Sequence, residues 1–158
     1  MNWGSVALWG FVGSLVMTLL MAGCQGLGIT RMNIPFLLGT MLTPDRDRAK
    51  LLGIGLHVIN GWVWALLYAA IFESLQVADV WVGMLISIFH ALFSLAVGMP
   101  ILPAIHPRMA SEQRGPTPTR QLEPPGFMAL HYGRRTPISV LFAHLVFGAI
   151  QGGFYHLH

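Results

Sequence analysis

The sequence predicts an all-α protein: an integral membrane four-helix bundle that forms a single transmembrane domain over residues 1–158. The first observation is composition, because 54% of the residues are hydrophobic and only 9% are charged, whereas about a quarter of a soluble domain is charged. The second is the presence of four apolar stretches of the ~20 residues that a helix needs to cross a bilayer. The third is a pattern shared by the second and fourth stretches, which predicts a two-fold internal repeat of helical hairpins.

The same composition excludes three other classes of protein. Disordered chains are polar and rich in charge, and this chain is neither. A disulfide scaffold needs several cysteines, and Cys24 is the only cysteine. The chain has nine Lys and Arg against six Asp and Glu. Because these basic residues gather in two connectors rather than along one binding face, no nucleic-acid partner is expected.

The apolar stretches define four spans that must be helical, because no water satisfies backbone groups inside a bilayer. The expected spans are 5–25, 49–74, 80–102 and 137–155. Asp79 is expected to cap the third span, and Pro100 and Pro103 are expected to disrupt its far end. The apolar segment 32–38 is too short to span, so it is expected to lie at the interface or to dip back into the bundle.

The basic residues predict the orientation of the chain in the membrane. All nine lie in, or next to, the connectors 26–48 and 103–136. The positive-inside rule therefore assigns both connectors to the cytoplasm and both termini to the outside of the cytoplasmic (inner) membrane. Arg48 and Arg135 stand at the starts of the second and fourth spans, where they are expected to anchor these helices at the anionic inner leaflet.

The predicted repeat depends on the motif H-x3-G-x6-Y. It occurs twice, as His57, Gly61 and Tyr68 and again, 87 residues later, as His144, Gly148 and Tyr155. At the same separation, Gly39, Met41 and Arg48 match Gly126, Met128 and Arg135. A weaker echo relates Ser14-Leu15 of the first span to Ser94-Leu95 of the third. These matches predict two copies of one two-helix unit in the same orientation.

Each copy of the motif places polar and small residues on one face of its helix, since successive residues are 100° apart. One face holds His57, Gly61, Trp64 and Tyr68, with Asn60 at its edge, and the other holds His144, Gly148, Gln151 and Tyr155. His90 lies near the middle of the third span. Both faces are expected to point toward other helices, because glycines permit close packing and buried polar groups need partners.

Three interpretations of the histidines are open. Each neutral imidazole can bond to a neighbouring helix and fix the helix register. Alternatively, His57 and His144 bind haem b or a transition metal, with His90 as a third ligand or support. In the third interpretation they belong to a path for protons or solutes. The nine methionines are scattered and indicate core filling rather than a copper site.

The run G-T-M-L-T-P-D-R-D-R-A-K, followed by G-L-H-V-I-N-G and L-L-Y, resembles a family of small, uncharacterised four-helix bacterial inner-membrane proteins. The resemblance covers mainly residues 39–73, with a fainter copy at 126–155. It implies an inner-membrane location and supplies no catalytic residues.

No catalytic motif accompanies this topology. The sequence contains no H-E-x-x-H, no G-x-S-x-G and no paired carboxylates within the spans. The chain is therefore expected to be non-enzymatic and to act as an accessory or scaffold subunit of a larger membrane assembly. Its expected partners are membrane lipid and either other membrane subunits or further copies of itself. The alternatives are a haem- or metal-binding membrane protein and a small transporter or channel.

Overall fold

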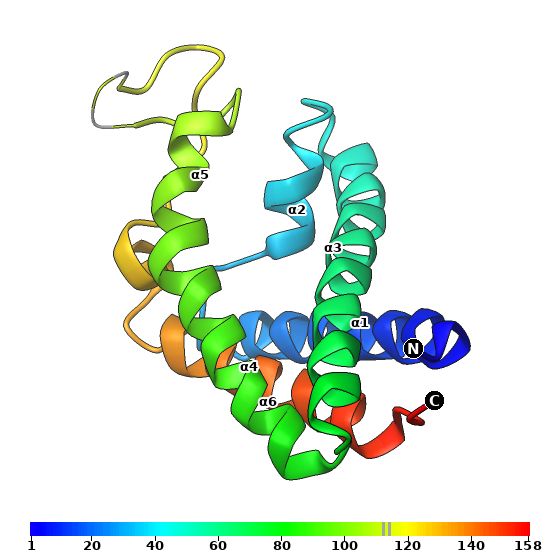
Figure 1. Cartoon of the computed structure of the whole chain (residues 1–158). Coiled ribbons are helices and arrows are strands. Elements are labelled where there is room, and N and C mark those ends of the chain that lie inside the picture. Colours follow the sequence, from blue (N-terminus) through cyan, green and yellow to red (C-terminus); the bar gives the residue numbers. More distant parts are fainter. Residues whose placement is uncertain (112, 114) are drawn as a thin grey trace.

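The computed structural model describes residues 1–111, 113 and 115–158, and these residues form an all-helical fold (Figure 1). Four helices are long and apolar enough to cross a membrane, as predicted. They are α1 (Trp3–Gly26), α3 (Arg46–Leu75), the continuous segment Val80–Ile105 and α6 (Thr136–Phe154). Each predicted span falls within the corresponding helix or extends one residue beyond it, which confirms the positions of the four long apolar helices.

The third span differs from the expectation at its far end. Asp79 caps α4 (Val80–Phe93) as predicted, because its Oδ1 accepts the N–H groups of Trp81 and Val82 at 2.7 and 3.0 Å. The prolines, however, do not end the span. A π-helical turn, η1 (Ser94–Gly98), leads into α5 (Met99–Ile105), and Pro100 lies in the first turn of α5, where a missing N–H costs little.

The long helices cross through small residues. α4 packs on α6, and α1 packs on both α3 and α6. Figure 1 shows that α1 crosses α3 steeply, whereas neighbouring helices in a simple up-and-down bundle run nearly parallel or antiparallel. A Cβ atom on Gly61 of α3 would overlap the Ser14 hydroxyl of α1. Likewise, a Cβ atom on Gly148 of α6 would overlap the Gly83 carbonyl of α4. Both crossings therefore depend on the absence of a side chain.

The apolar segment of the first connector folds back against the long helices. It forms the short helix α2 (Ile34–Gly39), whose start is capped by the side chain of Asn33. α2 packs on α3, and the contact leaves no room for a Cβ atom on Gly39 beside Ala49, or on Gly53 beside Pro35. The segment was expected to lie at the interface or to dip back into the bundle, and in the structure it packs against α3.

Hydrogen bonds and ion pairs between distant segments form at both ends of the molecule. At one end the two termini lie near the turn between α3 and α4 (Figure 1). There the Tyr155 hydroxyl donates to Glu73 Oε1 at 2.8 Å and accepts the Asn2 N–H at 2.9 Å. At the other end the two connectors bond to each other, most visibly where Arg31 donates to both carboxylate oxygens of Glu123 at 2.9 and 3.2 Å.

A second bond between the connectors involves His106, which is fully buried. Its Nε2–H donates to the Leu37 carbonyl at 2.9 Å, and its Nδ1 accepts the backbone N–H of Arg108 at 3.1 Å. A neutral imidazole satisfies both contacts, whereas a protonated one would turn an N–H toward the Arg108 N–H. Burial lowers the pKa of His106. The hydrogen bond to the Leu37 carbonyl raises the pKa, and the positive charges of Arg108 and Arg120 lower it, so that the net shift is downward.

Acidification is therefore expected to destabilise the protein through His106. Between the lowered native pKa and the unfolded value of 6.5, the unfolded chain binds the proton more strongly, so stability falls as the pH falls below 6.5. Thermal unfolding at pH 7.5 and 5.5 measures this loss. His106→Gln, whose amide can donate to Leu37 without titrating, should show a smaller loss than the wild type. An equal loss in both proteins would contradict this prediction.

Candidate functional site

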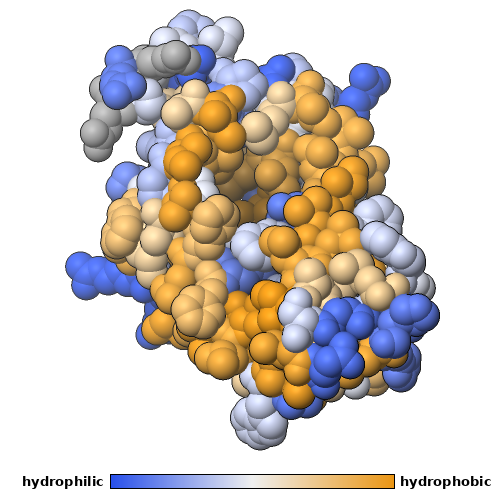
Figure 2. Space-filling view, in the orientation of Figure 1, coloured by the Kyte–Doolittle hydropathy of each residue, from blue (hydrophilic) through white to orange (hydrophobic). Residues whose placement is uncertain are grey.

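A cavity of about 360 Å³ lies between α3 and the segment from α4 to α5. Side chains from α1, α2 and α6 complete its walls. Figure 2 shows it as a hollow between two ridges of hydrophobic residues, so it opens on an apolar face of the molecule. The volume lies within the range of ligand pockets, about 300–1,000 Å³. It is therefore large enough to hold a small molecule.

Most of the cavity wall is apolar. Four of the nine methionines contribute to it, together with leucine, isoleucine and phenylalanine side chains; the four are Met17, Met21, Met32 and Met99. Of these, Met17, Met21 and Met32 are also buried members of the hydrophobic core. The prediction that the methionines fill the core therefore fits these three residues. It did not indicate that the same residues also line a cavity. Unbranched thioether side chains adapt readily to ligands of different shape.

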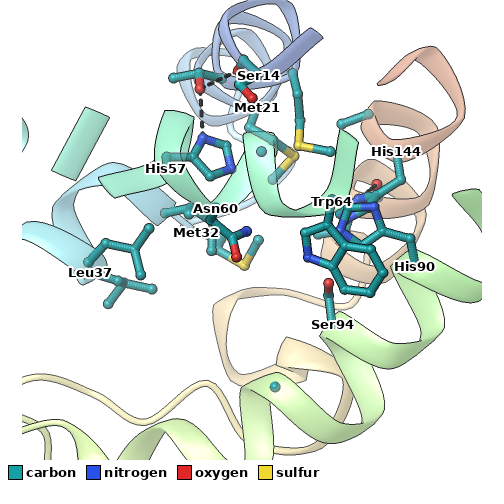
Figure 3. A pocket seen from close by; sticks show the side chains of 18 of the residues that line it. Ser14, Met21, Met32, Leu37, His57, Asn60, Trp64, His90, Ser94 and His144 are labelled. Atoms are coloured by element: carbon teal, nitrogen blue, oxygen red, sulfur yellow. Dashed lines mark hydrogen bonds between the residues drawn. The ribbon is translucent and has the colours of Figure 1, made fainter. Parts of the chain in front are cut away.

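His57 presents an unpaired nitrogen to this cavity. The Thr18 hydroxyl donates its single proton to the Ser14 carbonyl at 2.7 Å, so His57 Nδ1–H donates to Thr18 Oγ1 at 2.8 Å. Nε2 then keeps its lone pair and has no partner among the described residues. Because no described side-chain nitrogen or oxygen is both enclosed and unbonded, Nε2 must reach open space. Figure 3 shows the ring at the cavity wall.

On the opposite wall, His144 and His90 lie close together. Their ring centroids are 4.4 Å apart in an edge-to-face arrangement, and Trp64 stacks on His90 at 3.6 Å (Figure 3). His144 Nδ1–H donates to the Val140 carbonyl at 2.8 Å, which leaves its Nε2 with a lone pair. The Tyr68 hydroxyl lies 3.5 Å from His90 Nδ1. Both rings are thus held by groups of the protein through Nδ1.

Two further polar side chains line the cavity without a partner. Neither the Asn60 carboxamide nor the Ser94 hydroxyl makes a hydrogen bond within the described part of the chain. Asn60 lies on α3 one turn from His57, and Ser94 lies at the start of the π-helical turn, across the cavity (Figure 3). Asn60 is exposed, so its carboxamide costs free energy only where the surroundings are apolar and no other molecule supplies the bond.

The predicted polar faces are only partly brought together. The cavity is lined by six of the predicted residues: His57, Asn60, Gly61, Trp64, His90 and His144. The other four make contacts between helices. Tyr68 is fully buried in the core, Gly148 meets Gly83, the Gln151 amide donates to the Trp9 carbonyl at 2.7 Å, and Tyr155 bonds to Glu73. Arg48 and Arg135 are exposed.

The residues that the sequence pattern missed are Thr18 and Ser94. Thr18 fixes the His57 ring, and Ser94 adds a polar group to the opposite wall. A hydroxyl one turn after Ser14 on the same helix face was the available signal for Thr18.

The arrangement suits binding better than metal coordination. The close imidazole pair is His90 with His144, rather than His57 with His144. In the described parts of the chain no three His, Cys, Asp or Glu side chains gather so as to hold a metal ion. An apolar cavity with a few polar groups instead fits a small molecule with one polar end. Comparisons with family models, curated proteins and solved structures found no match for this chain.

Proposed function

We propose that this chain is a non-enzymatic, multi-pass protein of the cytoplasmic membrane that binds an amphipathic small molecule in the cavity between α3 and α4–α5. The observation that carries the proposal is the set of unpaired polar groups, above all His57 Nε2 and the Asn60 amide, around an otherwise apolar cavity. In a bilayer such groups find no water, so a ligand is the partner that satisfies them.

The membrane setting is supported by the surface as well as by the four long helices. Large apolar side chains on the outside include Leu19, Leu51 and Trp81, which are 71%, 74% and 78% exposed. In contact with acyl chains, such side chains carry no hydrophobic cost. The basic connectors lie together at one end of the molecule, and the positive-inside rule favours the cytoplasm for that end.

The internal repeat is supported by two similar helix crossings. In one, Gly61 meets Ser14; in the other, Gly148 meets Ser87 and Gly83. The partner segments share the spacing G-x3-S, as Gly10–Ser14 and Gly83–Ser87. We propose that Ser14 in the first copy corresponds to Ser87 in the second. The sequence alone had paired Ser14 with Ser94 instead.

Each of the other functions predicted from the sequence would give a different experimental result. An accessory or scaffold role requires a membrane partner that co-purifies with the chain, and it is compatible with a bound ligand. A haem protein would show a Soret band after purification. A transporter or channel would carry a solute across liposomes. A scaffold role does not require the unpaired groups at the cavity, and fewer than three His, Cys, Asp or Glu side chains gather in the described residues, so ligand binding is the proposal that the geometry favours.

Filling the cavity is expected to abolish binding. Gly98 lines it, and an added Cβ atom would meet only the Phe93 carbonyl oxygen, at 3.9 Å, so the Cβ atom of Gly98→Leu has room there. Retention of radiolabelled 1-dodecanol by the protein in nanodiscs, above that of empty nanodiscs, should fall at least about tenfold. The matched control is Gly55→Leu, on α3 away from the cavity, where nothing lies within 4 Å. Equal binding by both variants would refute the proposal.

A further inference from the structure

We infer that the ligand is a neutral lipid-like molecule whose polar end is a hydroxyl group, and that this hydroxyl donates its hydrogen to Nε2 of His57. The inference rests on the proposed function, because it names the chemical class that the cavity selects. It follows from three features of the cavity: the protonation of its imidazoles, the absence of charge on its walls and the direction in which it opens.

The protonation of the imidazoles determines which hydrogen-bonding role is left for the ligand. The Val140 carbonyl can only accept, so the proton of neutral His144 is on Nδ1. Thr18 holds His57 in the same tautomer. Both rings therefore offer the cavity a lone pair on Nε2 and no N–H. A hydroxyl can donate to such a nitrogen, whereas an ether, ester or ketone oxygen would face it with a second lone pair.

A second polar group of the cavity wall, the Asn60 side chain, can also bond to a hydroxyl that lies at His57. The Asn60 side chain lies one turn along α3 from His57 and is unbonded, so its N–H₂ can donate to the oxygen of the same hydroxyl. His57 itself is only 9% exposed, so a hydrogen bond to its Nε2 is shielded from water. One hydroxyl can thereby satisfy an acceptor and a donor of the protein at once.

The ligand is expected to be uncharged and long. No Lys, Arg, Asp or Glu is among the described residues that line the cavity, so a charged head group would be buried without a counter-charge. The apolar wall continues from the histidines to the hollow on the hydrophobic face (Figure 2). An alkyl or isoprenoid chain can therefore extend toward the lipid while its hydroxyl stays at His57.

A matched pair of probes tests the inference. 1-Dodecanol and dodecyl methyl ether have the same alkyl chain, but only the alcohol has a hydrogen to donate. In nanodiscs, with empty nanodiscs as the reference for partitioning, the alcohol is expected to bind about tenfold more tightly. If the two bind equally, the hydroxyl inference is wrong while the proposed function stands. If neither binds above the reference, the proposed function fails as well.

A variant identifies the acceptor. His57→Phe keeps a ring of similar shape and removes Nε2, so the alcohol should bind no better than the ether. His156→Phe makes the same substitution at an exposed residue outside the cavity, and it should keep the tenfold preference. A preference that persists in His57→Phe would overturn the assignment to His57. Should that variant fold poorly, the comparison of the two probes on the wild type still decides the inference.

Analysis of the purified protein supplies an independent check. If Nε2 of His57 binds a ligand hydroxyl, the protein should contain no stoichiometric metal and show no Soret band. A transition metal or haem bound in equal amount, and lost in His57→Phe, would overturn the inference, because a metal would then occupy the same lone pair. To distinguish sources of the hydroxyl, organic extracts of the protein can be analysed for long-chain alcohols and for phenolic lipids.

Discussion

Gly53→Ala is expected to destabilise the protein strongly, because its Cβ atom would overlap the backbone of Pro35. The overlap involves the Pro35 carbonyl group and Cα, which are backbone atoms that cannot rotate away as the end of a side chain can. α2 would have to move off α3. We expect the free energy of unfolding to fall by about 3 kcal/mol or more, measured by reversible unfolding in mixed micelles. Since Pro35 and Leu37 also line the cavity, binding of 1-dodecanol should weaken too.

The control for this substitution lies two residues further along the same helix. Gly55 has nothing within 4 Å of the position where a Cβ atom would stand, so Gly55→Ala should change the free energy of unfolding by less than about 1 kcal/mol. The two variants have the same composition and differ only in the helix face that receives the methyl group. If they unfold alike, the close contact between α2 and α3 is not a feature of the folded protein.

The positions of the helices could be predicted because they follow from local chemistry. A run of ~20 apolar residues in a bilayer must be helical, and the four long helices lie where the apolar runs are. The start of α4 was predictable for a similar reason, since Asp79 is a residue type whose side chain accepts the first N–H groups of a helix. None of these features depends on how the helices pack together.

The neighbour of each polar face could not be predicted in the same way. Helical periodicity places His144, Gly148 and Gln151 on one face but does not say which helix that face meets. In the structure Gly148 contacts α4 and the Gln151 amide bonds to α1, while His144 lies beside His90. The partner is set by which glycines allow two backbones to approach, and that depends on both helices of the pair.

Ser94 was missed although regular periodicity could have found it, because it lies four residues after His90 on the same helix face. It stands where α4 passes into the π-helical turn, and a π turn carries an extra residue. The residues beyond that turn are therefore rotated relative to the faces that 3.6 residues per turn assign to them. Pro100 and Pro103 were expected to disrupt the far end of the third span, and a π-helical turn does precede Pro100, but the helix continues through both prolines to Ile105.

Arg108→Met is expected to lower the free energy of unfolding by about 2 kcal/mol, because the guanidinium group satisfies the open end of α2. The last carbonyl groups of a helix have no partner within it. Arg108 Nη1 donates to the Thr40 carbonyl at 2.6 Å and lies 3.4 Å from that of Met41. The substitution keeps an apolar stem of similar reach but removes the donor and the charge. Thermal unfolding of purified protein at pH 7.5 measures the loss.

Arg134→Met is the matched control, since Arg134 belongs to the same connector, is exposed and makes no hydrogen bond or ion pair within the described residues. It removes the same charge, and its effect should stay within about 0.5 kcal/mol. A loss confined to Arg108→Met would mean that the second connector holds α2 against α3 and so shapes one wall of the cavity. If both variants lose equal stability, net charge rather than this bond is responsible. If neither loses stability, the connector does not hold α2 in place.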